Sequence, residues 1–298
     1  MGAFGLLTSA CVPATFTNLP NFSSKPIAGP AMAPAQLPAF NVGDLYYYSN
    51  GSREQIVSIE GETLNMISRS KRKLANFRNF VLPTPYIEGK TKEFYKVSDI
   101  ATNTLWPLSI GKTSKFTTEG RSVSKASGQT STYMQRWDCA VEGTERVRIL
   151  AGEFDTYRVK CRRLSSKGKW WQNRTWNYSP MLGTYVLRRD FYKKKSVRIR
   201  ELTAVRPSLQ DVPKKVRSNI IRTWQSALES KKSGDIASWT DRVVGVSVQV
   251  EPLNTFKGEN GQFCRTYKQY LTRKGVTRIY SGVACRTGKL KWRTPRRG

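Results

Sequence analysis

The stretch that decides the fold of the C-terminal part is residues 256–292, FKGENGQFCRTYKQYLTRKGVTRIYSGVACRTGKLKW. Its pattern predicts two antiparallel strands, residues 264–270 and 277–285, joined by a turn at residues 274–275. The glycines and the asparagine before residue 262 mark a further turn. The chain therefore places a hairpin near its C-terminal end, with a short third strand to follow.

The five cysteines occur as one leader residue and two pairs: Cys11, then Cys139 with Cys161, then Cys264 with Cys285. Counting outward from the predicted turn places Cys264 nearly opposite Cys285, and cysteines on facing strands can be bridged without a backbone movement. Cys139 and Cys161 lie on either side of an Ala-Gly turn. We predict two structural disulfides; separate buried thiols are the alternative for the C-terminal pair. No CxxC spacing occurs, so metal binding is not expected, and paired cysteines suit an oxidising compartment.

The same stretch resembles the C-terminal domain of bacterial surface-antigen proteins, the family that includes the rickettsial small surface antigen. In that family a CREY-like strand returns as a GTACR-like strand and a tryptophan follows. The matching positions here are Cys264, Arg265, Tyr267, Gly282, Ala284, Cys285, Arg286 and Trp292. The resemblance extends back to residues 227–230 and implies a cell-envelope location without any chemistry. Many members carry a glycine-zipper membrane segment before this domain; none precedes it here, so no membrane-spanning role carries over.

The charge balance is the most unusual bulk property of the chain. Its 298 residues hold 51 Lys and Arg against 21 Asp and Glu, a net charge of +30. Such a field attracts polyanions, including nucleic acid, anionic lipid, lipopolysaccharide and acidic polysaccharide. The chain has no histidine, which excludes His-based acid–base catalysis and most zinc or iron sites. No paired carboxylates or phosphate loop occur either, so we expect neither an enzyme nor a cofactor.

The N-terminal segments predict attachment to a membrane. Residues 1–11 resemble the end of a bacterial lipoprotein signal, with Cys11 as the lipidated residue, although the apolar run is short and no Lys or Arg precedes it. An unstructured leader with a free thiol is the alternative. A lipid on Cys11 would tether the protein to the membrane rather than make it span one. Residues 12–40 carry prolines at near-regular intervals, which predicts an extended, poorly packed tether.

Residues 41–207 predict an antiparallel β domain. Asn50-Gly51 is the strongest hairpin signal, and strand patterns with turn residues between them recur to residue 205. No helical pattern interrupts them, so we expect a curved antiparallel sheet or half-barrel. The runs at 151–161 and 176–186 resemble, more weakly, bacterial envelope domains whose half-barrels are similar to lipoprotein carriers.

Residues 208–298 predict an α+β domain with a basic tail. A helix is expected over residues 208–234, since Val212, Val216, Ile220, Trp224 and Leu228 follow at i+4 spacing. We expect this apolar stripe to pack on the C-terminal sheet. The whole chain is therefore mainly β with a minor α+β part.

Basic residues beside aromatic residues are the candidate sites for an anionic partner. This pattern suits a single-stranded nucleic acid or a glycan; a solvated basic face with tryptophans in the core is the alternative. Arg265 and Arg286 flank the bridge cysteines and predict either a paired cationic site or a structural role on the outer face of the hairpin. The candidate residues are Arg69, Lys71, Arg72, Lys73, Arg162, Arg163, Lys193, Lys194, Lys195, Arg265 and Arg286.

These observations predict a non-enzymatic bacterial envelope protein of the outer membrane or periplasm. Its role would be structural, adhesive or that of an assembly subunit, through contact with an anionic envelope polymer or lipid or with other envelope proteins. A basic nucleic-acid-binding or ribonucleoprotein component is one alternative, which the net charge alone would favour. A half-barrel carrier of a lipid or other apolar ligand is another, and a large apolar cavity would point to it.

Overall fold

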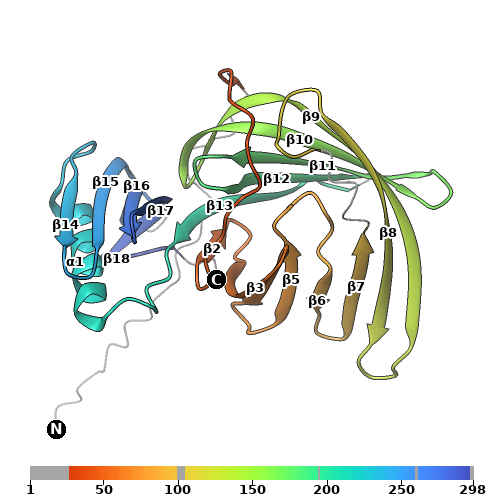
Figure 1. Cartoon of the computed structure of the whole chain (residues 1–298), viewed down its shortest axis with the longest axis horizontal. Coiled ribbons are helices and arrows are strands. Elements are labelled where there is room, and N and C mark those ends of the chain that lie inside the picture. Colours follow the sequence, from red (N-terminus) through yellow and green to blue (C-terminus); the bar gives the residue numbers. More distant parts are fainter. Residues whose placement is uncertain (1–26, 99–104, 194, 259–260, 296–298) are drawn as a thin grey trace, which may run out of the picture.

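A closed antiparallel barrel of twelve strands forms the larger part of the molecule (Figure 1). The computed structural model describes residues 27–98, 105–193, 195–258 and 261–295. Strands β2 to β13 pair in chain order, and β13 returns to β2 to close the barrel. The barrel strands are β2 (Leu45–Tyr48), β3 (Arg53–Glu60), β4 (Thr63–Ser68), β5 (Lys73–Phe77), β6 (Tyr86–Glu88), β7 (Lys92–Ser98), β8 (Thr113–Ser124), β9 (Thr130–Ile149), β10 (Gly152–Ser165), β11 (Trp170–Ser179), β12 (Thr184–Tyr192) and β13 (Arg198–Arg206).

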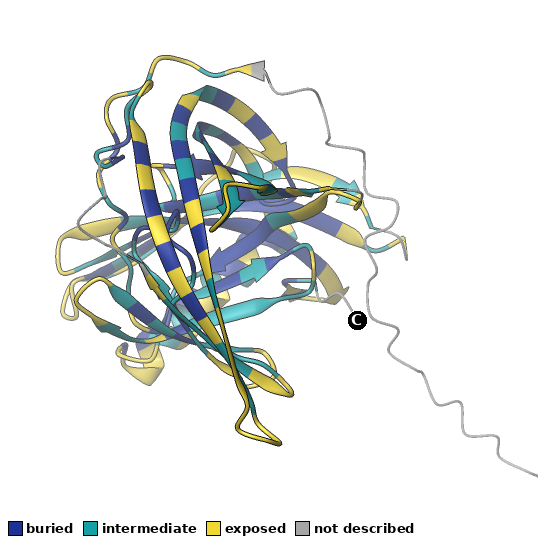
Figure 2. Ribbon diagram, turned by 90° about the vertical axis from the view of Figure 1, so that its right-hand side faces the viewer, coloured by how far each residue is buried: buried dark blue, intermediate teal, exposed yellow. Residues whose placement is uncertain are grey.

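The mainly β class predicted from the sequence is confirmed, and the half-barrel is closed further than expected. Strands β5, β6 and β7 were not predicted as such, and they complete the circle between β4 and β8. Buried and exposed residues alternate along the long strands β8 and β9, as the stripes in Figure 2 show. This alternation directs one set of side chains into the barrel and the other set outward.

The C-terminal part is one helix packed on a small antiparallel sheet. Helix α1 (Lys214–Ser230) buries Val216, Ile220, Trp224 and Leu228, the stripe predicted from their spacing. It begins at residue 214 rather than 208, because Pro213 precedes its first turn. The sheet consists of β14 (Ala237–Asp241), β15 (Val246–Lys257), β16 (Phe263–Arg273), β17 (Val276–Gly288) and β18 (Lys291–Arg293), paired in that order.

Both predicted disulfides are present. Cys139 and Cys161 are directly paired residues of β9 and β10, and Cys264 and Cys285 are paired in the same way on β16 and β17. Each bridge therefore joins two neighbouring strands of one hairpin. Cys11 lies outside the described residues, so its lipidation stays a prediction.

The C-terminal part docks against the barrel at a point where two backbones approach closely. Ala204 of β13 pairs with Gly282 of β17, and a Cβ on Gly282 would lie 2.5 Å from the Cβ of Ala204. Beside it, the Ser281 hydroxyl donates a hydrogen bond of 2.7 Å to the carbonyl of Ala151, in the β9–β10 turn. One hydrophobic core runs through both parts, so they are packed as one body.

The predicted tether is wrong for residues 27–40, which pack on the barrel as a strap. Strand β1 (Ile27–Ala28) pairs with β9, and Ala35 is buried and forms a β-bridge with Leu108. The hydroxyl of Tyr157 donates to the carbonyls of residues 32 and 33, at 2.9 Å each. Because prolines leave the carbonyls of an extended chain free to accept hydrogen bonds, the same composition suits a docked strap.

Candidate functional site

The two ends of the barrel differ in what occupies them. At one end, the strap packs with Val81, Leu82, Leu105 and Leu108 against inward-facing aromatic residues, and we call this the filled end. The β9–β10 turn that contacts the C-terminal part belongs to this end. The opposite end carries the turns β2–β3, β4–β5, β6–β7, β8–β9, β10–β11 and β12–β13. We call this second end the mouth.

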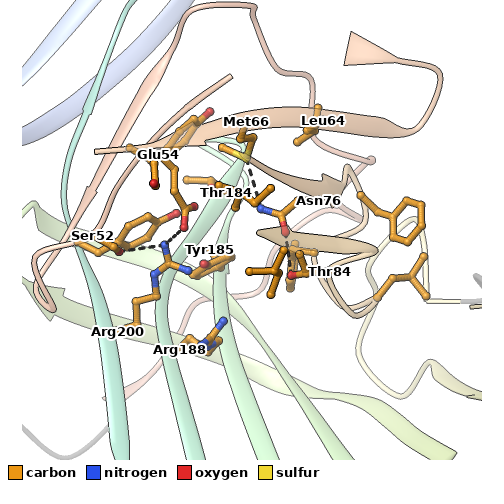
Figure 3. A pocket seen from close by; sticks show the side chains of 18 of the residues that line it. Ser52, Glu54, Leu64, Met66, Asn76, Thr84, Thr184, Tyr185, Arg188 and Arg200 are labelled. Atoms are coloured by element: carbon orange, nitrogen blue, oxygen red, sulfur yellow. Dashed lines mark hydrogen bonds and ion pairs between the residues drawn. The ribbon is translucent and has the colours of Figure 1, made fainter. Parts of the chain in front are cut away.

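A cavity of about 360 Å³ lies inside the barrel, between β2–β6 and β11–β13 (Figure 3). Half of the residues that line it are apolar or aromatic, and the other half are polar or charged; the uncharged polar residues are Ser52, Ser68, Asn76, Thr84 and Thr184. Pockets that combine apolar walls with a set of placed polar groups are the usual form of a small-molecule site. The apolar and aromatic lining residues include Tyr46, Leu64, Met66, Leu74, Phe80 and Trp176.

Charged residues line the polar side of the same cavity: the cations Arg72, Lys73, Arg174, Arg188 and Arg200, and the carboxylates Glu54 and Glu88. Arg200 forms an ion pair with Glu54 and stacks over the ring of Tyr48, with 3.7 Å between its Cζ and the ring centroid. Arg174 and Arg188 both form ion pairs with the buried Asp190, the second at 3.0 Å. The Arg200–Glu54 pair balances its own charge, whereas Arg174 and Arg188 share a single carboxylate.

Two further cations extend this cluster inside the barrel. Arg163 stacks between Trp137 and Trp171, at 5.5 and 5.2 Å from their ring centroids. Burial, together with repulsion from Arg163, Arg174 and Arg188, lowers the pKa of Lys96 to about 8. Within the described parts of the chain, Lys96 forms no ion pair. Among the described residues, the ion pairs of the lumen cluster of Lys96, Arg163, Arg174 and Arg188 are made to one carboxylate, that of Asp190.

The mouth brings together two basic clusters that are distant in the sequence. Residues 69–72 form the β4–β5 turn, and Lys73 begins β5. Lys193 and Lys195 lie in the β12–β13 connection, where they line a shallow groove with Trp170, Trp171, Tyr192 and Arg198. Lys194 lies outside the described residues. The mouth also carries Glu88, which forms an ion pair with Lys125 at 3.2 Å.

The remaining predicted site residues do not join the mouth. Arg162 points outward from β10 and pairs with Asp138 at 3.0 Å. Arg265 is buried, and its Nη1 donates to the carbonyls of Leu228 and Lys231 at the end of α1. The predicted paired cationic site is therefore wrong for Arg265.

Arg286 has a similar structural environment. Its guanidinium binds both carboxylate oxygens of Glu229 on α1, and the indole N–H of Trp292 donates to that carboxylate at 2.8 Å. The alternative prediction of a structural role describes both arginines, but its placement on the outer face of the hairpin is wrong, since both contact α1. They face the helix because the β16–β17 sheet packs its inner side on α1.

Sequence reasoning missed Lys96, Arg174, Arg188 and Asp190 as members of one site. The signal that could have found them is strand alternation, since Gln172, Arg174 and Trp176 are alternate residues of β11. Alternation alone does not say which set faces inward, and the closed barrel decides it.

The fold and the cavity define a disulfide-bridged β-barrel protein with a cationic lumen. Among the described residues, no helix is long and apolar enough to cross a membrane. Residues 226–293 match the family described as 17 kDa outer membrane surface antigen. The resemblance inferred from the hairpin is confirmed for this part of the chain. The predicted location in the bacterial cell envelope agrees with that family.

Individual relatives match a stretch of similar length. The 17 kDa surface antigens of Rickettsia bellii and Rickettsia prowazekii (strain Madrid E) are 34% and 36% identical to the chain over 70 residues, 24% of this chain and 44% of each antigen. That of Rickettsia australis is 38% identical over 64 residues, 22% of this chain and 42% of the antigen. The chain thus spans less than half the length of these relatives.

Part of the chain also aligns with a solved structure. The crystal structure of the hypothetical lipoprotein YmcC from Escherichia coli (K12) aligns with a TM-score of 0.40 and 14% identity, covering 58% of this chain and 87% of that one.

Proposed function

We propose that this protein is a non-enzymatic envelope protein that binds an anionic envelope polymer or lipid surface through the mouth of its barrel. The observation that supports this proposal is the convergence of the basic turn at residues 69–73 with Lys193 and Lys195 on one end of the barrel. The opposite end is filled and carries the C-terminal part. Pro295 of the C-terminal part lies beside Arg69 and the β2–β3 turn at the edge of the mouth, so a flat anionic surface would meet the remaining turns of the mouth.

The physical basis is a concentrated positive field. Exposed Lys and Arg near an anionic lipid surface contribute about 1 kcal/mol each, and cations that share one end of a barrel act on the same surface. Trp171, which is 54% exposed, lies in the groove beside Lys193. An exposed indole next to cations suits the boundary between polar headgroups and apolar chains. A structural, adhesive or assembly role would each use this same contact between the mouth and an anionic surface.

The test compares two charge reversals of equal size. One variant carries Lys71→Glu, Arg72→Glu and Lys193→Glu at the mouth. The control carries Lys214→Glu, Lys215→Glu and Arg222→Glu on the exposed face of α1. Binding is measured by sedimentation with vesicles that contain anionic phospholipid, with lipopolysaccharide, and with single-stranded DNA, over a range of salt concentrations.

The mouth variant should lose roughly 100-fold in affinity for the envelope anions, since three cations at about 1 kcal/mol each amount to about 3 kcal/mol. The control should lose far less, because its residues lie on the C-terminal part. Equal losses in both variants would mean that only the net charge of +30 matters, and the mouth would not be the site. Tighter binding of DNA than of either envelope anion, with a steep salt dependence, would favour the nucleic-acid alternative.

A further inference from the structure

The lumen of the barrel contains an unbalanced group of cations. Lys96, Arg163, Arg174 and Arg188 point inward, and Asp190 is the carboxylate that pairs with two of them. The Nε atoms of Arg163 and Arg188 are buried without a hydrogen-bond partner. Burying a cation without a matching anion costs free energy, so buried cations are normally paired with an anionic group. The barrel is therefore short of negative charge at this position.

Mutual repulsion inside the cluster agrees with this deficit. Burial lowers the pKa of Arg174, and the neighbouring Arg188 lowers it further. Burial also lowers the pKa of Arg163, with Arg174 adding to the effect. A bound oxyanion would reverse these shifts, because arginine binds carboxylate and phosphate oxygens through paired N–H donors.

The cationic cluster opens directly onto an apolar space. Arg174, Arg188 and Leu74 line the 360 Å³ cavity. Leu64 and Met66 lie across this cavity from Arg188 (Figure 3). The two arginines keep 18% and 26% of their side-chain surface exposed. An oxyanion that contacts them has an apolar volume immediately beside it.

We propose that the barrel lumen binds a small anionic amphiphile, with its carboxylate or phosphate head on Arg174 and Arg188 and its apolar body against Leu64, Met66 and Leu74. This site lies inside the barrel and goes beyond the surface contact proposed above. The cavity is at the small end of the usual range for ligand pockets, so it suits a single chain or ring system and excludes a two-chain phospholipid.

Calorimetric titration of the intact oxidised protein with four probes tests the proposal. Dodecanoate and dodecyl phosphate carry both head and chain, dodecanol carries only the chain, and inorganic phosphate carries only the head. Titrations in about 0.5 M NaCl, below the critical micelle concentrations, suppress binding to exposed cations. One or both of the anionic amphiphiles should bind at least about tenfold more tightly than dodecanol and inorganic phosphate. The stronger of the two identifies the headgroup.

Three variants locate the binding. Arg188→Gln should weaken the bound amphiphile about tenfold or more, while Arg162→Gln on the outer face of β10 should change it less than about twofold. Leu74→Trp keeps every charge and fills the apolar space, so it should also abolish binding, even if the Arg188 variant fails to fold. A variant with only Lys71→Glu and Lys193→Glu, which leaves the cavity-lining Arg72 in place, should retain amphiphile affinity at high salt, and this separates the proposal from the surface contact.

Several results would overturn the proposal. Binding of dodecanol as tight as that of dodecanoate and dodecyl phosphate would show an apolar pocket without a role for the arginines. Binding of inorganic phosphate as tight as that of dodecyl phosphate would show a simple anion site. Unchanged affinity in Leu74→Trp, or equal effects of the Arg188 and Arg162 variants, would place the amphiphile elsewhere.

Discussion

Replacing Arg265 by methionine should destabilise the C-terminal part, although it removes one cation from a strongly basic protein. Helix α1 has no basic residue in its last turn, and Arg265 supplies that charge from β16. Its Nη1 donates to the carbonyls of Leu228 and Lys231 at 2.9 and 2.7 Å. Both carbonyls belong to the helix end, where a cation also interacts favourably with the helix dipole.

The magnitude follows from these contacts. Two hydrogen bonds from a charged donor contribute about 1.5–3 kcal/mol each, and the helix dipole adds about 0.5–1 kcal/mol. Burial of the guanidinium opposes them, as the lowered pKa of Arg265 indicates. We expect a net loss of about 3 kcal/mol in the free energy of unfolding for Arg265→Met.

Urea denaturation followed by tryptophan fluorescence measures this loss, since Trp224 of α1 packs on Tyr267 of β16. Arg286→Met is the matched control, because Arg286 is 41% exposed and its ion pair should contribute about 1 kcal/mol or less. A loss below about 0.5 kcal/mol for Arg265→Met, together with weaker binding to anionic vesicles, would refute the structural role. That result would make Arg265 a candidate anion-binding residue again.

Two further changes test the junction of the two parts and the barrel hairpin. Burial raises the pKa of Asp44 from 3.8 to about 6, although the Ser208 N–H lowers it in part. Protonation of Asp44 therefore stabilises the folded protein; this stabilisation is complete below about pH 4 and is lost as the pH rises through about 6. Asp44→Asn should raise the free energy of unfolding at pH 7 by up to about 3 kcal/mol, because the asparagine carries no charge. Urea titrations from pH 4 to 7 measure this, and parallel profiles for both proteins would contradict it. Replacing Cys139 and Cys161 by alanine should cost about 3 kcal/mol, because the bridge closes a loop with a sequence separation of 22 residues; a loss below about 1 kcal/mol would show that the strand pairing alone holds the hairpin.

The C-terminal hairpin and the disulfides could be predicted because their determinants are local. Lys274 has a positive φ of 49° and Gly275 one of 76°, so the turn that sets the register is encoded in two adjacent residues. Once the register is known, Cys264 and Cys285 must face each other. The helix was predictable for the same reason, since its apolar stripe repeats within a single element.

Closure of the barrel could not be predicted, because it depends on pairing between distant residues. Leu45 of β2 pairs with Arg206 of β13, and the local sequence of neither strand specifies which strand it pairs with. The strap shows the same limit: prolines specify an extended chain, whereas the hydroxyls of Tyr157 and Tyr178 decide where it docks. The lumen cluster depends on both features, since only a closed barrel brings Lys96 of β7 towards Arg174 of β11.

The position of the C-terminal part explains why the two proposed sites can coexist in one chain. Gly282 and Ser281 of this part contact the barrel beside the filled end, and Pro295 lies beside Arg69 at the edge of the mouth. A larger contact at the mouth would have covered the basic turns and the route to the cavity. The close approach at position 282 requires glycine, because a side chain there would collide with Ala204. The fold therefore separates the part that matches the surface antigens from the end of the barrel where the cations are concentrated, and an anionic partner can reach the mouth while the C-terminal part stays packed.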